Sequence, residues 1–197
     1  MFQAPPPLTQ TLIALNVIAF ALETLLGARW FADLMLWPLG ADFAPWQVLT
    51  YGFLHGSLTH LLFNMLGLYM FGSDIERVWG QRRYLVFYLV CVVTAAIAQL
   101  IVTAMMGSVH PTVGASGGVF GLLLAFGMMF PRRTVVLLIP PIPMPAWLFV
   151  TLYGLIELYL GITGTASGVA HFAHLGGMVG GYVLILYWRS GGRRSRY

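Results

Sequence analysis

Charged side chains are so scarce in this chain that water cannot be the solvent for most of it. Ten basic and six acidic residues make up 8% of the 197 positions, and 59% of the positions are hydrophobic. Soluble domains carry about 25% charged residues. The mean hydropathy is +0.83, and a domain of this size still exposes much of its surface. An ordinary soluble domain is therefore excluded, and the pattern predicts an all-α integral membrane protein.

The length of the chain limits its architecture. A membrane-spanning helix needs about 20 apolar residues, so 197 residues hold six spans and no separate soluble domain. Apolar runs between loop signals predict one membrane domain, residues 1–197, with spans at about 8–27, 48–72, 84–106, 114–130, 146–162 and 168–188. The fourth span is short and is expected to begin within the membrane. The aromatic-rich loop 28–46 is expected to be a structured element at the membrane interface.

The arginines predict how the spans are oriented. Only Arg29 lies in a loop after an odd-numbered span, and the other nine follow even-numbered spans: Arg77, Arg82, Arg83, Arg132, Arg133, Arg189, Arg193, Arg194 and Arg196. The positive-inside rule then places both termini in the cytoplasm. Because the basic residues lie at span ends, no nucleic-acid partner is expected. The first apolar run lacks the features of a cleaved signal or targeting segment, which favours a bacterial plasma membrane.

Polar residues within the apolar spans are costly and are therefore candidates for function. They lie in the second, fourth and sixth spans: His55, His60, Asn64, Ser116, His171 and His174. His60 and Asn64 are four residues apart and share a helix face. Asn64 is expected about 16 residues into its span and His174 about 6 into its own. Because all three spans run inward, the polar groups are predicted to meet in the outer half of the membrane.

This set of residues can support serine hydrolase chemistry. Ser116 would be the nucleophile, His174 the base, and His60 and Asn64 the donors to an oxyanion. Spacing alone leaves Ser116 equally consistent with a helix-packing residue. Spacing alone also allows His171 as the base, although the Leu-Gly-Gly that follows favours His174. A metal site of His60, His171 and His174 lacks the H-E-x-x-H pattern and an adjacent carboxylate, and no metal is predicted.

Glycines are expected to bring the fourth and sixth spans into close contact. Gly117, Gly118 and Gly121 lie on one span, and Gly177 and Gly181 on the other, and small residues let helix backbones approach each other. Gly114 also permits unusual backbone angles just before the candidate nucleophile.

No carboxylate lies beside His174 in the sequence. Glu157, near the outer end of the fifth span, is expected to reach the membrane interface instead. The sequence therefore predicts a Ser–His dyad without a carboxylate.

Four motifs in order resemble those of rhomboid intramembrane serine proteases of the basic six-helix form. They are His55-x4-His60-x3-Asn64, Gly72-x3-Glu76-x3-Gly80, Gly114-x-Ser116-Gly117 and Ala173-His174-x2-Gly177-x3-Gly181. Each motif is weak by itself, but four at matching positions are strong. The resemblance runs from Trp46 through the sixth span. It implies a rhomboid-like bundle.

The resemblance also implies an activity and a role for each residue. It implies a serine endopeptidase that cleaves transmembrane segments of other membrane proteins, with no cofactor. Ser116 and His174 would form the dyad, His60 and Asn64 the oxyanion site, and His55 a hydrogen-bonding support. Phe120 stands where some members stack a tyrosine on the catalytic histidine, and Gln47 stands where many have an arginine.

Two other functions are weighed against the protease. One is a catalytically inactive relative that binds membrane proteins, which a missing serine or histidine would indicate. The other is a small transporter lined by His60, Asn64 and His174, which paired discontinuous repeats would support. The sequence has neither feature.

Overall fold

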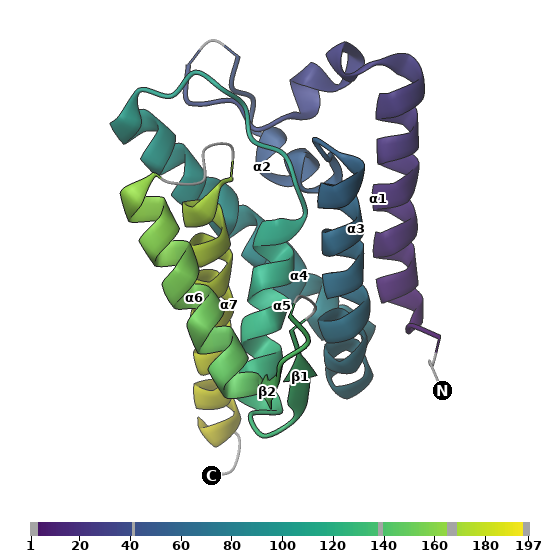
Figure 1. The fold of residues 1–197 in the computed structure, drawn as a ribbon, viewed down its shortest axis with the longest axis vertical. Helices are drawn as coiled ribbons and strands as arrows, with labels where there is room; N and C mark the ends of the chain where they lie inside the picture. Colours follow the sequence, from purple (N-terminus) through teal and green to yellow (C-terminus); the bar gives the residue numbers. More distant parts are fainter. Residues whose placement is uncertain (1–3, 41, 138–139, 165–168, 195–197) are drawn as a thin grey trace.

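A computed structural model describes residues 4–40, 42–137, 140–164 and 169–194, and these form a helical bundle (Figure 1). The described part contains seven α-helices: α1 Pro7–Leu26, α2 Gln47–Thr50, α3 Leu58–Gly67, α4 Ser73–Met106, α5 Ser116–Met129, α6 Ala146–Thr163 and α7 His171–Arg194. Within these residues, three helical stretches are long and apolar enough to cross a membrane: Pro7–Leu26, Leu58–Met106 and Ala146–Thr163. In Figure 1, α5 lies between α1 on one side and α6 on the other.

Small residues hold the centre of the bundle together. A Cβ atom on Gly177 of α7 would collide with the backbone carbonyl of Gly117 of α5, so the two helices touch at their backbones. The close contact expected between these two segments is therefore present. Gly118 and Gly181 serve a different contact from the one expected, because they face Tyr88 and Phe87 of α4. Helix α4 is thus the third member of this central group.

The second predicted span begins later than expected. Residues 47–53 form only α2 and a short 3-10 turn, Tyr51–Phe53, and α3 starts at Leu58. The start is set by Ser57, whose side chain accepts a hydrogen bond from the His60 N–H at 3.1 Å, as an N-cap does. Asn64 is consequently two turns into its helix rather than 16 residues into it.

The predicted spans end at residue 72 and resume at 84, but the segment between them is helical rather than a separating loop. The chain stays helical from α3 through the π-helical turn Leu68–Gly72 into α4, because Ile75 and Glu76 are buried against the bundle. The helix breaks only at Gly80, with φ 74° and ψ 164°, backbone angles that favour glycine. The turn between the two predicted spans is therefore a single residue.

Glu76 fastens the beginning of α1 to α4. Its carboxylate accepts hydrogen bonds from the Leu8 N–H at 3.0 Å, and from the Thr9 N–H and hydroxyl, each at 2.7 Å. The first N–H groups of a helix have no partner within the helix, so this carboxylate satisfies two of them in a buried place.

The loop 28–46 is structured, as the sequence predicts. It contains a 3-10 helix, Ala28–Leu34, and is held by Gln47, which is 1% exposed. The Gln47 amide accepts from the Trp37 N–H at 3.1 Å and donates to the carbonyls of Asp42 at 2.9 Å and Asp33 at 3.3 Å. A neutral amide therefore holds three points of the loop by hydrogen bonds.

The remaining elements follow the sequence closely. Helix α6 starts at Ala146, the first residue of the predicted fifth span. The segment before it contains the short strands β1 (Thr134–Val136) and β2 (Pro143–Pro145), which pair antiparallel. Helix α7 continues past the predicted end at residue 188 to Arg194. Both termini lie at the same end of the bundle (Figure 1).

Candidate active site

Ser116 is the first residue of α5, and the glycine before it shapes the approach. Gly114 has φ 133°, and its N–H donates to the Tyr51 carbonyl at 2.9 Å. A Cβ atom at position 114 would lie 2.7 Å from Cε1 of His60, so only glycine leaves room for that ring. Because Ser116 opens the helix, its N–H belongs to the helix-start donors without an intrahelical partner. These donors carry the positive end of the helix dipole.

His174 lies at the end of the first turn of α7 and faces Ser116. Its Nε2 is 2.8 Å from the Ser116 Oγ, and the residue is 8% exposed. The ring stacks on Phe120, with centroids 4.2 Å apart and planes 6° apart. The ring contact that Phe120 was expected to keep is therefore present, and it holds the imidazole flat against α5.

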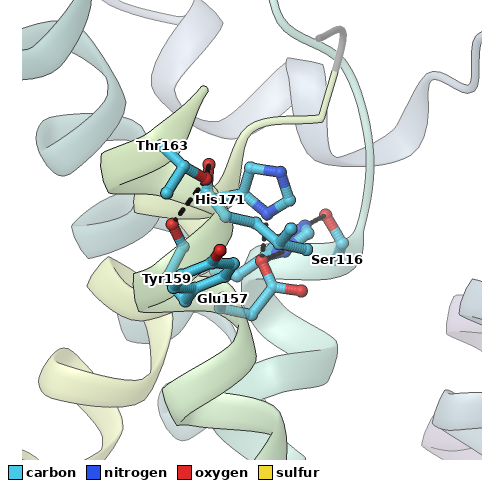
Figure 2. A network of polar contacts seen from close by, with 7 residues as sticks. Ser116, Glu157, Tyr159, Thr163 and His171 are labelled. Atoms are coloured by element: carbon cyan, nitrogen blue, oxygen red, sulfur yellow. Dashed lines mark hydrogen bonds and ion pairs between the residues drawn. The ribbon is translucent and has the colours of Figure 1, made fainter. Parts of the chain in front are cut away.

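Glu157 lies against His174, and this corrects the sequence prediction. Its Oε2 is 2.8 Å from Nδ1 of His174 and 2.7 Å from Nδ1 of His171 (Figure 2). The carboxylate is buried rather than at the interface. Helices α6 and α7 pack closely at Gly161, where a Cβ would lie 3.2 Å from the His171 Cβ. This approach, one turn beyond Glu157, brings the carboxylate to both rings.

Sequence reasoning missed this contact although a signal was present. An acidic residue in an apolar span is costly unless it has a polar partner inside the protein, which makes Glu157 a candidate by that criterion alone. The sequence did not show which residue would be that partner, because Glu157 and His174 are 17 positions apart and lie on different helices.

The expected oxyanion residues, His60 and Asn64 of α3, line the same cavity as Ser116. His60 sits beside Gly114, and the Asn64 side-chain amide donates to the His60 carbonyl at 3.1 Å. The hydrogen-bonding support expected of His55 stays a prediction; its ring is buried beside the Phe53 backbone. His55 meets His60 edge to face, with centroids 5.0 Å apart. Its backbone N–H donates to the Glu23 carboxylate at 3.2 Å.

Ser116 and His174 open onto a cavity of about 1160 Å³. It is bounded by α3, α5, α6, the start of α7 and the segments before α5 and along β1, and its polar lining includes Ser57, Thr59, His60, Asn64, Gln99, Ser116, Tyr153 and His174. Apolar side chains complete the wall, among them Phe63, Met70, Phe149 and Leu123. The cavity therefore combines an apolar wall with a polar region at Ser116 and His174.

Glu157, His171 and His174 are the described residues with ligand atoms close enough to suit a metal ion, all within 4.8 Å of one another. His60, which the sequence allowed as a third ligand with the two histidines, is not among them. The hydrogen bonds between the carboxylate and the two rings already account for the cluster.

The fold and the site together define a helical membrane protein with a serine–histidine pair in hydrogen-bond contact. Residues 42–190 match the family described as the Rhomboid domain. The chain therefore belongs to the rhomboid family and is an integral membrane protein, and the resemblance seen in its motifs is confirmed.

Several relatives are named as rhomboid proteins. The chain is 29% identical over 185 residues to rhomboid protease GluP of Bacillus subtilis (strain 168). The aligned region covers 90% of this chain and 34% of GluP. It is 28% identical over 188 residues to rhomboid protease GlpG of Serratia proteamaculans, covering 92% and 62%. It is 35% identical over 148 residues to RHOMBOID-like protein 4 of Arabidopsis thaliana, covering 71% and 33%. The chain thus spans about one to two thirds of these relatives.

Proposed function

We propose that this protein is an intramembrane serine endopeptidase that cleaves transmembrane segments of membrane-protein substrates. The observation that carries the proposal is the 2.8 Å contact between the Ser116 hydroxyl and the His174 Nε2, at the edge of a cavity large enough for a peptide. Homology to proteins named as rhomboid proteases supports it.

In the proposed reaction, the Ser116 Oγ attacks the carbonyl carbon of the scissile bond while its proton moves to the His174 Nε2. The oxyanion that forms accepts hydrogen bonds from the Ser116 N–H and from the His60 and Asn64 side chains. His174 then gives its proton to the leaving amine, and the peptide bond breaks. A water molecule that loses a proton to His174 hydrolyses the acyl-enzyme, and Ser116 regains its hydrogen.

The proposal includes an arrangement in the membrane. The whole of residues 1–197 would form one rhomboid-like domain of six spans, with α3 and α4 as two of them and α5 as the short one. Both termini lie at one end of the bundle, where Arg77 and Arg133 pair with Asp74 at 3.2 and 2.7 Å. This end would face the cytoplasm of a bacterium, and Ser116, at the opposite end of α5, would open to the external side.

A fluorophosphonate probe tests the proposal against its two alternatives. Such a probe forms a covalent bond only with an activated serine, so the purified protein should be labelled at Ser116, and the His174→Ala variant should not. Peptide mapping by mass spectrometry locates the label. A folded protein that takes no label but captures a transmembrane peptide would indicate the inactive relative, and one that does neither would favour the transporter.

Loss of an oxyanion donor should lower kcat less than loss of the nucleophile. His60→Ala or Asn64→Ala is expected to lower kcat for a transmembrane substrate on the order of 10²–10³-fold, because one donor to the developing charge is lost. Asn16→Ala is the matched control, since Asn16 is a buried asparagine on α1 that donates within its own helix, to the Leu12 carbonyl. Wild-type kcat in both site variants would remove these residues from the oxyanion site.

A further inference from the structure

Resting on the proposed protease function, we propose that Glu157 is a positioning residue for His174, so that the site works as a Ser116–His174–Glu157 triad. His171 holds the carboxylate in place. The juxtaposition that carries this is one carboxylate oxygen, Oε2, lying 2.8 Å from Nδ1 of His174 while the Nε2 of the same ring lies 2.8 Å from the Ser116 Oγ.

The hydrogen bonds fix which ring nitrogen of His174 carries the hydrogen. An ionised carboxylate only accepts hydrogen bonds, so the Nδ1 of His174 must donate to Glu157. The neutral ring then has its lone pair on Nε2, and it faces the Ser116 hydroxyl. With the opposite tautomer, an N–H would point at the hydroxyl and the base would be disabled. Glu157 therefore selects the tautomer that general-base catalysis needs.

The same carboxylate also stabilises the charge that forms during the reaction. When the proton of Ser116 moves to Nε2, His174 becomes an imidazolium ion with a negative charge 2.8 Å from its other nitrogen. This attraction is stronger in a poorly hydrated site than in water. The proton stays on His174 until it passes to the leaving amine, and Glu157 takes none.

His171 orients Glu157 rather than Ser116. Its Nδ1 donates to the same Oε2 at 2.7 Å, and its buried Nε2 has no hydrogen-bond partner among the described residues. Two donors from one turn of α7 aim the carboxylate oxygen at the rings. The α6 residues Leu155, Tyr159 and Ile162 are more than half exposed, so Glu157 is a buried acidic group on a helix whose outer face is apolar. Its Oε2 accepts a hydrogen bond from each of these two histidines.

Other titratable groups also face this part of the site. Among the described residues, Tyr153 lies near Glu157 on α6, and His60 of α3 lies near His174 across the cavity. His171 shares α7 with His174. Each of these groups remains in a variant of Glu157 alone, so a change in the pH dependence of that variant reports on the carboxylate.

The test is the Glu157→Gln variant, with EDTA present. We expect its rate of fluorophosphonate labelling and its kcat to fall on the order of 10²-fold, with little change in KM. The acid limb of the rate–pH profile should move to lower pH, because the imidazolium form of His174 loses its negative neighbour. The labelling rate and kcat of the His171→Ala variant should fall less, because His174 still donates a hydrogen bond to the Glu157 carboxylate.

Glu76→Gln is the matched control. It removes another buried carboxylate that accepts three hydrogen bonds, at the opposite end of the bundle. Its melting temperature should fall, but its labelling profile against pH should match that of the wild type. A merely structural role for Glu157 predicts the same behaviour for both variants.

The outcomes separate this proposal from the protease function. A folded Glu157→Gln variant with the wild-type rate and an unshifted profile overturns the triad. Wild-type protein that takes no label at Ser116 contradicts the protease function instead. ¹⁵N NMR of histidine-labelled wild-type protein gives a second test that misfolding of a variant does not affect. We expect the hydrogen of His174 on Nδ1, and a hydrogen on Nε2 of the neutral ring would overturn the proposal.

Discussion

Replacing Ser116 by alanine is expected to lower kcat for cleavage of a transmembrane substrate on the order of 10⁶-fold. The hydroxyl is the atom that attacks the peptide carbonyl in the proposed reaction. Cleavage is followed by gel analysis of a single-span substrate in proteoliposomes. The substrate is expected to bind with unchanged affinity, because the alanine side chain still fits the cavity wall.

The His174→Ala variant should lose nearly as much activity as Ser116→Ala. The double variant should lose little more than either single variant, because nucleophile and base act as a unit. A melting curve in detergent for each variant guards against unfolding. Cleavage at the wild-type rate by folded Ser116→Ala protein would exclude Ser116 as the nucleophile and with it the proposed activity.

Gly177→Ala is expected to destabilise the bundle by about 2–3 kcal/mol, as overpacking does, and to slow labelling of Ser116. Helix propensity alone predicts the reverse, since alanine is favoured over glycine within a helix by about 0.5–1 kcal/mol. The added methyl, however, would collide with the Gly117 carbonyl. Relief of that collision must push α7 from α5, and the Ser116–His174 contact bridges these two helices.

The control for Gly177→Ala lies on the same helix. Among the residues that the structure describes, none has an atom within 4 Å of a Cβ added at Gly191, so Gly191→Ala should leave the melting temperature unchanged or raise it slightly. Thermal unfolding in one detergent measures both variants. Equal melting temperatures for the two would show that α5 and α7 do not need their backbone contact.

The sequence predicted most of the helices and the meeting of Ser116 with His174. Membrane helices can be recognised from local composition, so α1, α5 and α6 start and end within a few residues of their predicted limits. The errors arose where local composition is ambiguous. The polar segment Gly72–Gly80 resembles a loop, but burial of Ile75 and the bonds of Glu76 to Thr9 keep it helical.

Scarcity of charge determined by itself that this chain folds in lipid, and the few polar residues within its spans identified where chemistry could occur. Those conclusions need only the identity and order of residues, because the cost of a polar group in an apolar span does not depend on its partner. Which side chains meet was decided by the tertiary structure alone. The pairing of Glu157 with His174 depends on how α6 packs against α7 at Gly161, and local sequence carries no record of a contact made between two helices.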